Sequence, residues 1–171
     1  MKSKLAFVIR FLAVFALLIV VGWWSTAPVA YAGALRVAAS FTSPLANGWS
    51  LEQRPETTGR QEIWFRRGND QLRLGLSLQA LALGLLPMLS LLGATPGMGP
   101  ARMAGRAAIG IAALFALDLV ILLLYPALVG SKNALTDIVG TFLGLLTFVG
   151  GPVILWFALT FRELHDVWRL G

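Results

Sequence analysis

Residues 107–128 read AAIGIAALFALDLVILLLYPAL, an apolar stretch in which Asp118 is the only charged residue. A helix needs about 20 apolar residues to cross the hydrocarbon core of a bilayer, and this stretch is long enough. Three further apolar segments occupy residues 5–24, 74–92 and 138–161. The sequence therefore predicts an all-α integral membrane protein with four transmembrane helices.

The composition favours the same fold class. Of the 171 residues, 57% are hydrophobic and 13% are charged, whereas charged residues make up about 25% of a typical soluble domain. A soluble fold of this length would not bury so much apolar surface. The chain has no cysteine and one histidine, which argues against a disulfide framework, a cysteine nucleophile and a zinc site built on several histidines.

The charges and the apolar segments divide the chain into four regions. We expect an N-terminal membrane anchor helix over 1–24, a periplasmic segment over 25–72, a three-helix membrane bundle over 73–161 and a cytoplasmic tail over 162–171. The net charge of +6 fits the basic flanks of membrane segments better than a nucleic-acid site. The basic N-terminus favours a bacterial inner-membrane protein with both termini in the cytoplasm.

A cleaved signal peptide is the alternative for the first region. Ala30-Tyr31-Ala32 before Gly33 fits the small-residue pattern of a cleavage site. The apolar stretch before it is long for a signal peptide, whose apolar core spans about 7–15 residues, so an uncleaved anchor is favoured.

The periplasmic segment is expected to contain a surface helix and a β-hairpin. Residues 30–46 are apolar with little charge and form a helix that either lies on the membrane surface or packs on the bundle. Residues 49–53 have the pattern of a short strand. Strand-favouring side chains follow at 63–65, and Gly68-Asn69-Asp70 is typical of a hairpin turn.

This segment is also the expected recognition surface. Its large apolar side chains are too many for an independent core of about 48 residues, so they must pack on the membrane helices, enter the membrane interface or be covered by a partner. The arginines of this segment alternate with acidic residues, which favours a solvated, mutually paired surface over a binding face for an acidic or peptide partner. In the second case the arginines suit a partner's carboxylates. The candidate partner-binding residues are Trp49, Trp64, Phe65, Arg66 and Arg67.

Asp118 is the most prominent single residue in the apolar segments. A carboxyl group near the centre of a bilayer costs about 2.5–3.5 kcal/mol unless it is protonated or paired, so Asp118 should face other helices. The candidate hydrogen-bond partners are Gln79, Thr141 and Thr147. An interhelical hydrogen bond that fixes packing is favoured over a proton or ion relay and over an anchor for a partner's basic residue.

Glycines indicate where helices approach one another. Gly140 and Gly144 form a GxxxG pattern in the last apolar segment, which favours close packing within the chain over a contact with a second protein. The run 150–152, Gly-Gly-Pro, is expected to loosen or kink the same helix. His165 lies alone in the charged tail, and we find no catalytic constellation, no cofactor motif and no metal site.

The layout resembles the exosortase H-associated membrane proteins of Gram-negative bacteria. The resemblance lies in GWWSTAP at 22–28, in the hairpin at 65–74 that runs into LSLQALALGLLPMLSLLGATPG, and in GGPVILWFAL at 150–159. It implies a non-catalytic accessory protein that partners an exosortase, a membrane transpeptidase that sorts proteins. The alternative hypothesis is a small transporter or channel subunit that uses Asp118.

Overall fold

The computed structural model describes residues 2–23, 26–42, 48–55, 61–74, 78–129, 138 and 142–168. The elements in chain order are α1 (Lys2–Trp23), α2 (Ala27–Thr42), β1 (Ser50–Pro55), β2 (Gln61–Arg67), β3 (Asp70–Leu74), α3 (Leu78–Leu81), η2 (Ala82–Gly84), α4 (Leu85–Ala94), α5 (Pro100–Val129), η3 (Leu146–Gly150) and α7 (Gly151–Trp168).

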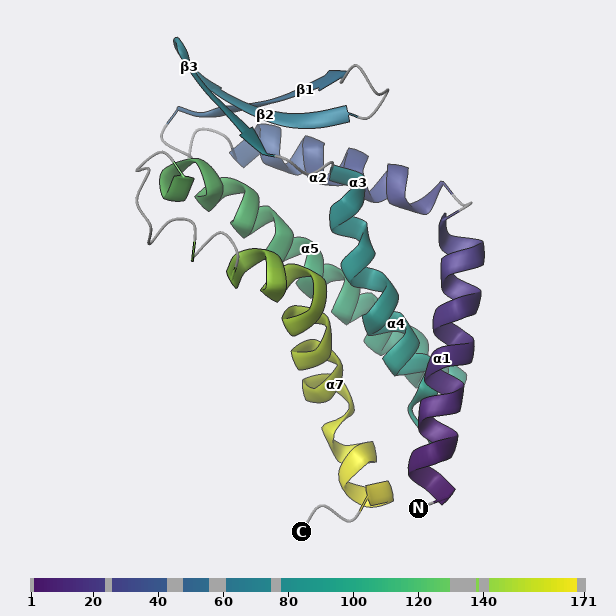
Figure 1. Cartoon of the computed structure of the whole chain (residues 1–171). Coiled ribbons are helices and arrows are strands. Elements are labelled where there is room, and N and C mark those ends of the chain that lie inside the picture. The colour runs from purple at the N-terminus through teal and green to yellow at the C-terminus, as the bar shows by residue number, and fades with distance from the viewer. Residues whose placement is uncertain are drawn as a thin grey trace.

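Long helical runs form the body of the molecule, and the sheet lies beyond one end of them (Figure 1). The described part of the chain ascends in α1, descends through α3, η2 and α4, ascends in α5 and descends through η3 and α7. Within this body, α4 packs against α1, α5 and α7. Helix α2 runs crosswise between the sheet and the helical runs, and α1 begins and α7 ends at the end far from the sheet.

Two helices are long and apolar enough to cross a membrane, namely residues 100–127 and 142–165. The apolar runs 5–21 and 78–94 are shorter, so two of the four predicted spans are matched by helices of full spanning length. The long helices expose large apolar side chains, among them Ile109 of α5 and Ile154 of α7, which are 59% and 61% exposed. Such surfaces suit lipid better than water.

The predicted hairpin is part of a three-stranded antiparallel sheet in the order β1-β2-β3. Gly68 adopts a φ of 58° at the turn between β2 and β3, a conformation that glycine adopts without the steric cost of a Cβ. Successive side chains of a strand point to opposite faces, so Ile63 and Phe65 of β2 face one side and Trp64 faces the other.

The inner face of the sheet and α2 pack on the helices and form one apolar core with them. We call α2, the three strands and Trp49, which directly precedes β1, the cap. The cap contributes Tyr31, Ala32, Leu35, Trp49, Ile63 and Phe65, and the helices contribute Leu78, Leu81, Ala82 and Leu122. The large apolar residues of the predicted periplasmic segment are therefore divided between this shared core and the outer surface.

The last helical run is interrupted by a π-helix over Leu146–Gly150, directly before Gly151 and Pro152. Pro152 has no backbone N–H and cannot continue a regular hydrogen-bond ladder, and the Gly151 N–H bonds to the Leu146 carbonyl five residues back. The irregularity expected at 150–152 is thus this π-helix, which we call the π-turn below.

Close backbone approach occurs at other glycines than the expected pair. A Cβ on Gly84 would lie 2.8 Å from the Thr147 carbonyl oxygen, so η2 contacts the π-turn only because residue 84 has no side chain. A Cβ on Gly144 would meet no described atom within 4 Å. Among the described residues Gly144 thus makes no close contact with another helix, and Gly140, the other half of the predicted packing pair, lies outside the described residues.

A pair of glycine substitutions tests this packing. Gly84→Ala should destabilise the protein by about 1–3 kcal/mol, because the added methyl group forces η2 away from the Thr147 backbone. Gly144→Ala is the matched control and should leave the thermal midpoint in detergent unchanged or slightly raised. Equal effects of the two substitutions would contradict the packing described here.

Candidate functional site

Asp118 is buried beneath the cap and bound by a cap residue. The Tyr31 hydroxyl donates a hydrogen bond of 2.7 Å to Asp118 Oδ2, and the two residues are 9% and 2% exposed. Tyr31 belongs to α2 and Asp118 to α5, so one hydrogen bond joins segments that lie 87 positions apart. The carboxyl group therefore links the cap directly to a candidate membrane helix.

The sequence around Tyr31 places its ring on the inner side of α2. Leu35 and Ala39 follow Tyr31 at four-residue spacing, so the three share one helix face, and all three are buried. The Tyr31 ring also packs edge-on against Phe115, with the ring centroids 5.6 Å apart. Phe115 precedes Asp118 by one helical turn, so the ring contact and the hydrogen bond hold Tyr31 together.

A second aromatic contact fixes the sheet to the same helix. The rings of Phe65 in β2 and Tyr125 in α5 lie 5.6 Å apart. Asp118, Leu122 and Tyr125 are spaced at i, i+4 and i+7, which places them on one face of α5. That face of α5 thus receives both components of the cap, α2 at Asp118 and the sheet at Tyr125.

The electrostatics of the pair follow from its burial. Burial raises the pKa of the Tyr31 phenol above its ordinary value, and the hydrogen bond to Asp118 and its charge act in the same direction. Tyr31 therefore remains a neutral hydrogen-bond donor at physiological pH. The second carboxyl oxygen, Asp118 Oδ1, is buried and has no hydrogen-bond partner among the described residues.

The partners that the sequence suggested for Asp118 are corrected by this geometry. Gln79 is exposed, the Thr147 hydroxyl donates to its own helix at the Leu143 carbonyl, and Thr141 lies outside the described residues. Sequence reasoning missed Tyr31 because it searched for partners in the apolar segments. The available signal was that a single tyrosine interrupts the small apolar residues of the predicted surface helix.

The five candidate partner-binding residues are separated into two environments. Trp49 and Phe65 are 7% and 3% exposed in the shared core, so the interpretation of these two as partner-binding residues is wrong. Arg67 lies at the cap surface, where its guanidinium is 4.7 Å from the centroid of the Trp49 ring and 3.6 Å from an Asp70 carboxylate oxygen.

Trp64 and Arg66 lie on the outer face of the sheet. Trp64 is half-buried and is paired in the strand register with Glu52 of β1 and Arg73 of β3, and Arg66 is exposed. The Arg66 guanidinium is 3.6 Å from a Glu52 carboxylate oxygen, and the side chains of this ion pair are 51% and 34% exposed. This outer face is the part of the predicted recognition surface that a partner could reach.

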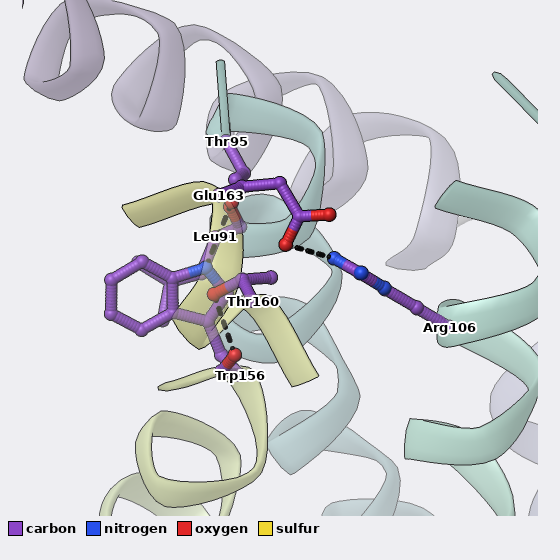
Figure 2. Close-up of polar contacts among 6 residues, drawn as sticks. All are labelled: Leu91, Thr95, Arg106, Trp156, Thr160 and Glu163. Carbon is purple, nitrogen blue, oxygen red and sulfur yellow. Dashed lines mark hydrogen bonds and ion pairs between the residues drawn. The ribbon is translucent and has the colours of Figure 1, made fainter. Parts of the chain in front are cut away.

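A second polar cluster lies where α4, α5 and α7 meet (Figure 2), and the end of α4 and the start of α5 lie far from the sheet (Figure 1). The Trp156 indole donates a hydrogen bond of 2.9 Å to the Thr95 hydroxyl, which in turn donates to the Leu91 carbonyl. Phe7 of α1 stacks on Trp156 with centroids 5.8 Å apart. These contacts join α1, the end of α4 and α7.

An ion pair between Arg106 and Glu163 joins α5 to α7 in the same region. Their side chains are 22% and 14% exposed, so the pair is largely removed from water. Sequence reasoning placed Glu163 in the predicted cytoplasmic tail but did not pair it with Arg106. The pairing could have been inferred from the topology. In antiparallel neighbouring helices, the start of one helix and the end of the other lie at the same depth, so Arg106 and Glu163 can meet.

The chain matches no protein-family model, no curated protein and no solved structure. Among the described residues, no group of three or more histidine, cysteine and acidic side chains is placed to hold a metal ion. The candidate site is therefore interpreted from its own geometry. It consists of the outer face of the sheet, with Glu52, Trp64 and Arg66, and of the Tyr31–Asp118 pair beneath it.

A double-mutant cycle tests the link between the cap and α5. Tyr31→Phe and Asp118→Leu should each destabilise the protein by about 1–3 kcal/mol, because each leaves a buried polar group without its partner. The double variant should lose less than the sum of the two, since both polar groups are then removed. Asp118→Asn keeps an acceptor for Tyr31 and should be tolerated. Additive losses in thermal unfolding would contradict the hydrogen bond.

A charge exchange tests the ion pair at the far end. Arg106→Glu and Glu163→Arg should each lower stability by about 1–3 kcal/mol, between the effects expected for exposed and for fully buried pairs. The double exchange should restore most of the lost thermal midpoint. A double variant whose thermal midpoint is no higher than that of the less stable single variant would show that the two charges do not interact.

Proposed function

We propose that the protein is a non-catalytic accessory protein of the bacterial inner membrane that binds another membrane protein through the outer face of its cap. The resemblance to the exosortase-associated family names an exosortase-type transpeptidase as the partner. In this proposal the cap is periplasmic and both termini are cytoplasmic. The positions of the start of α1 and the end of α7, both far from the cap, support termini on one side of the membrane.

The observation that carries the proposal is the fixed attachment of the cap. One face of α5 receives the Tyr31 hydrogen bond at Asp118 and the Phe65 ring at Tyr125. The inner side of the sheet is buried in the shared core. The outer side therefore has a defined orientation relative to the helices. A surface held in this way loses little conformational freedom when it binds a partner.

The chemistry of the outer face suits a protein partner. Tryptophan and arginine are the residue types that most often dominate binding energies at protein interfaces. Trp64 and Arg66 lie two residues apart on one strand and therefore share this face. The Arg66–Glu52 ion pair is exposed and therefore weak, so Arg66 can exchange Glu52 for a carboxylate of the partner at little cost.

One observation favours the alternative of a transporter or channel subunit. Asp118 Oδ1 is buried without a hydrogen-bond partner among the described residues, as expected for a group that binds a proton or a cation during transport. The two functions differ in the response to Asp118→Asn. The accessory protein should still bind its partner, whereas a transporter should lose ion flux in liposomes while remaining folded.

Affinity purification from native membranes tests the accessory function. The double variant Trp64→Ala/Arg66→Ala should lose most of the co-purified exosortase, because it removes the aromatic and basic groups of the outer face. The matched control is Phe161→Ala/Arg162→Ala, which removes an exposed aromatic residue and an exposed arginine from α7. The control should retain the partner.

Membrane insertion should be normal in both double variants, because neither changes the length of an apolar segment. Undiminished recovery of the partner with Trp64→Ala/Arg66→Ala at normal expression would contradict recognition by the outer face. A native purification that yields no membrane protein in stoichiometric amount would contradict the accessory function itself.

A further inference from the structure

The outward side of α2 is apolar although it is exposed. Val29, Val37 and Phe41 are 58%, 56% and 80% exposed. Gly33 lies between them, and a Cβ at this position would meet no described atom within 4 Å. The four positions recur every four residues, so they form one continuous strip along the helix, on the side away from Tyr31. We call these residues the outward strip of α2.

The outward strip has almost no charge beside it. Arg36 is the one charged residue of α2, and the helix contains no acidic residue. Arg36 is exposed and precedes Val37, which places it at the edge of the strip. A surface helix that faces water normally carries polar residues on its exposed side. Helix α2 instead combines an apolar outward side with a basic edge, the pattern of helices that lie in a membrane interface.

The position of α2 in the fold matches such an interface. Figure 1 shows α2 running crosswise where α1 ends, where α3 begins and near the last turns of α5. Its inner side packs on residues of these helical runs, among them Leu78 and Leu122. A helix at this level lies where the apolar runs leave the hydrocarbon core.

The apolar surface continues from α1 onto α2. Leu17, Val20 and Val21 near the end of α1 are 60%, 63% and 58% exposed, and α2 begins at Ala27. The two helices also contact each other. Lipid that covers the last turns of α1 would therefore lie close to the start of the outward strip.

We propose that the outward strip of α2 is a lipid-binding surface that lies in the headgroup and upper acyl region of the bilayer, with Arg36 at the level of the lipid phosphates. The proposal rests on the membrane location stated under Proposed function, but not on the identity of the protein partner. That partner would use the outer face of the sheet, which is a different side of the cap. Lipid on one side and the Tyr31–Asp118 bond on the other then hold α2 in place.

Fluorescence quenching in vesicles tests the lipid contact, and the absence of native cysteine allows single-site labelling. A bimane probe is placed at Val37→Cys or Phe41→Cys in the full chain, in vesicles of phosphatidylcholine and phosphatidylglycerol. Asn69→Cys, at the exposed turn between β2 and β3, is the water-exposed control. Ile154→Cys, midway along the candidate span of residues 142–165, is the control for the hydrocarbon core.

Both α2 probes should be quenched several-fold more by nitroxides near the lipid headgroup than the Asn69 probe is. They should be quenched several-fold less by aqueous iodide. Iodide quenching equal to that at Asn69 would overturn the proposal in favour of a water-facing strip. Protection from both quenchers would overturn it in favour of a covering protein, such as a second copy.

Strongest quenching of the α2 probes by nitroxides near the acyl-chain ends would overturn the interfacial position. The Ile154 probe separates this result from a failure of the membrane location. If that probe is also insensitive to lipid nitroxides, the membrane location fails together with the lipid contact. If only the α2 probes are insensitive, the membrane location stands and the lipid contact is wrong.

Discussion

A single buried carboxyl group connects the two parts of this molecule. Asp118 lies on a helix that is otherwise apolar over two turns on either side, and its binding partner is the Tyr31 hydroxyl of the cap. A carboxyl group among apolar side chains is costly unless it is hydrogen-bonded. The cap reduces that cost by supplying the donor. The position of α2 and the burial of Asp118 therefore depend on each other.

The rest of the fold extends this connection at both ends of the helices. At the cap end, Phe65 and Tyr125 add an aromatic contact two turns beyond Asp118, so the sheet follows α2 onto the same face of α5. At the far end, the Arg106–Glu163 ion pair joins α5 to α7, and the Trp156–Thr95 hydrogen bond joins α7 to the end of α4. Polar contacts thus lie at the two ends of the bundle, and apolar packing with close glycine contacts lies between them.

The sequence predicted the elements better than their contacts. The hairpin turn at Gly68 and the apolar segment around Asp118 were recognised because turn chemistry and long apolar runs are local signals. The Tyr31–Asp118 pair was not, because no local pattern specifies a contact between residues 87 positions apart. Gly144 matched a packing motif, but the close approach occurs at Gly84, since the π-turn before Pro152 brings Thr147 to that glycine. The sequence does not predict that Trp49 and Phe65 are buried, because spacing along the chain does not identify the helix face that covers them.

In this structure the Tyr31–Asp118 contact fixes the orientation of the cap. Pulsed electron paramagnetic resonance between spin labels at Asn69→Cys and Ile154→Cys measures that orientation directly, since the labels report on the cap and on α7. We predict one narrow distance distribution that broadens markedly when Tyr31→Phe is added. A broad distribution before that change, or a narrow one that Tyr31→Phe leaves unaltered, would contradict the claim.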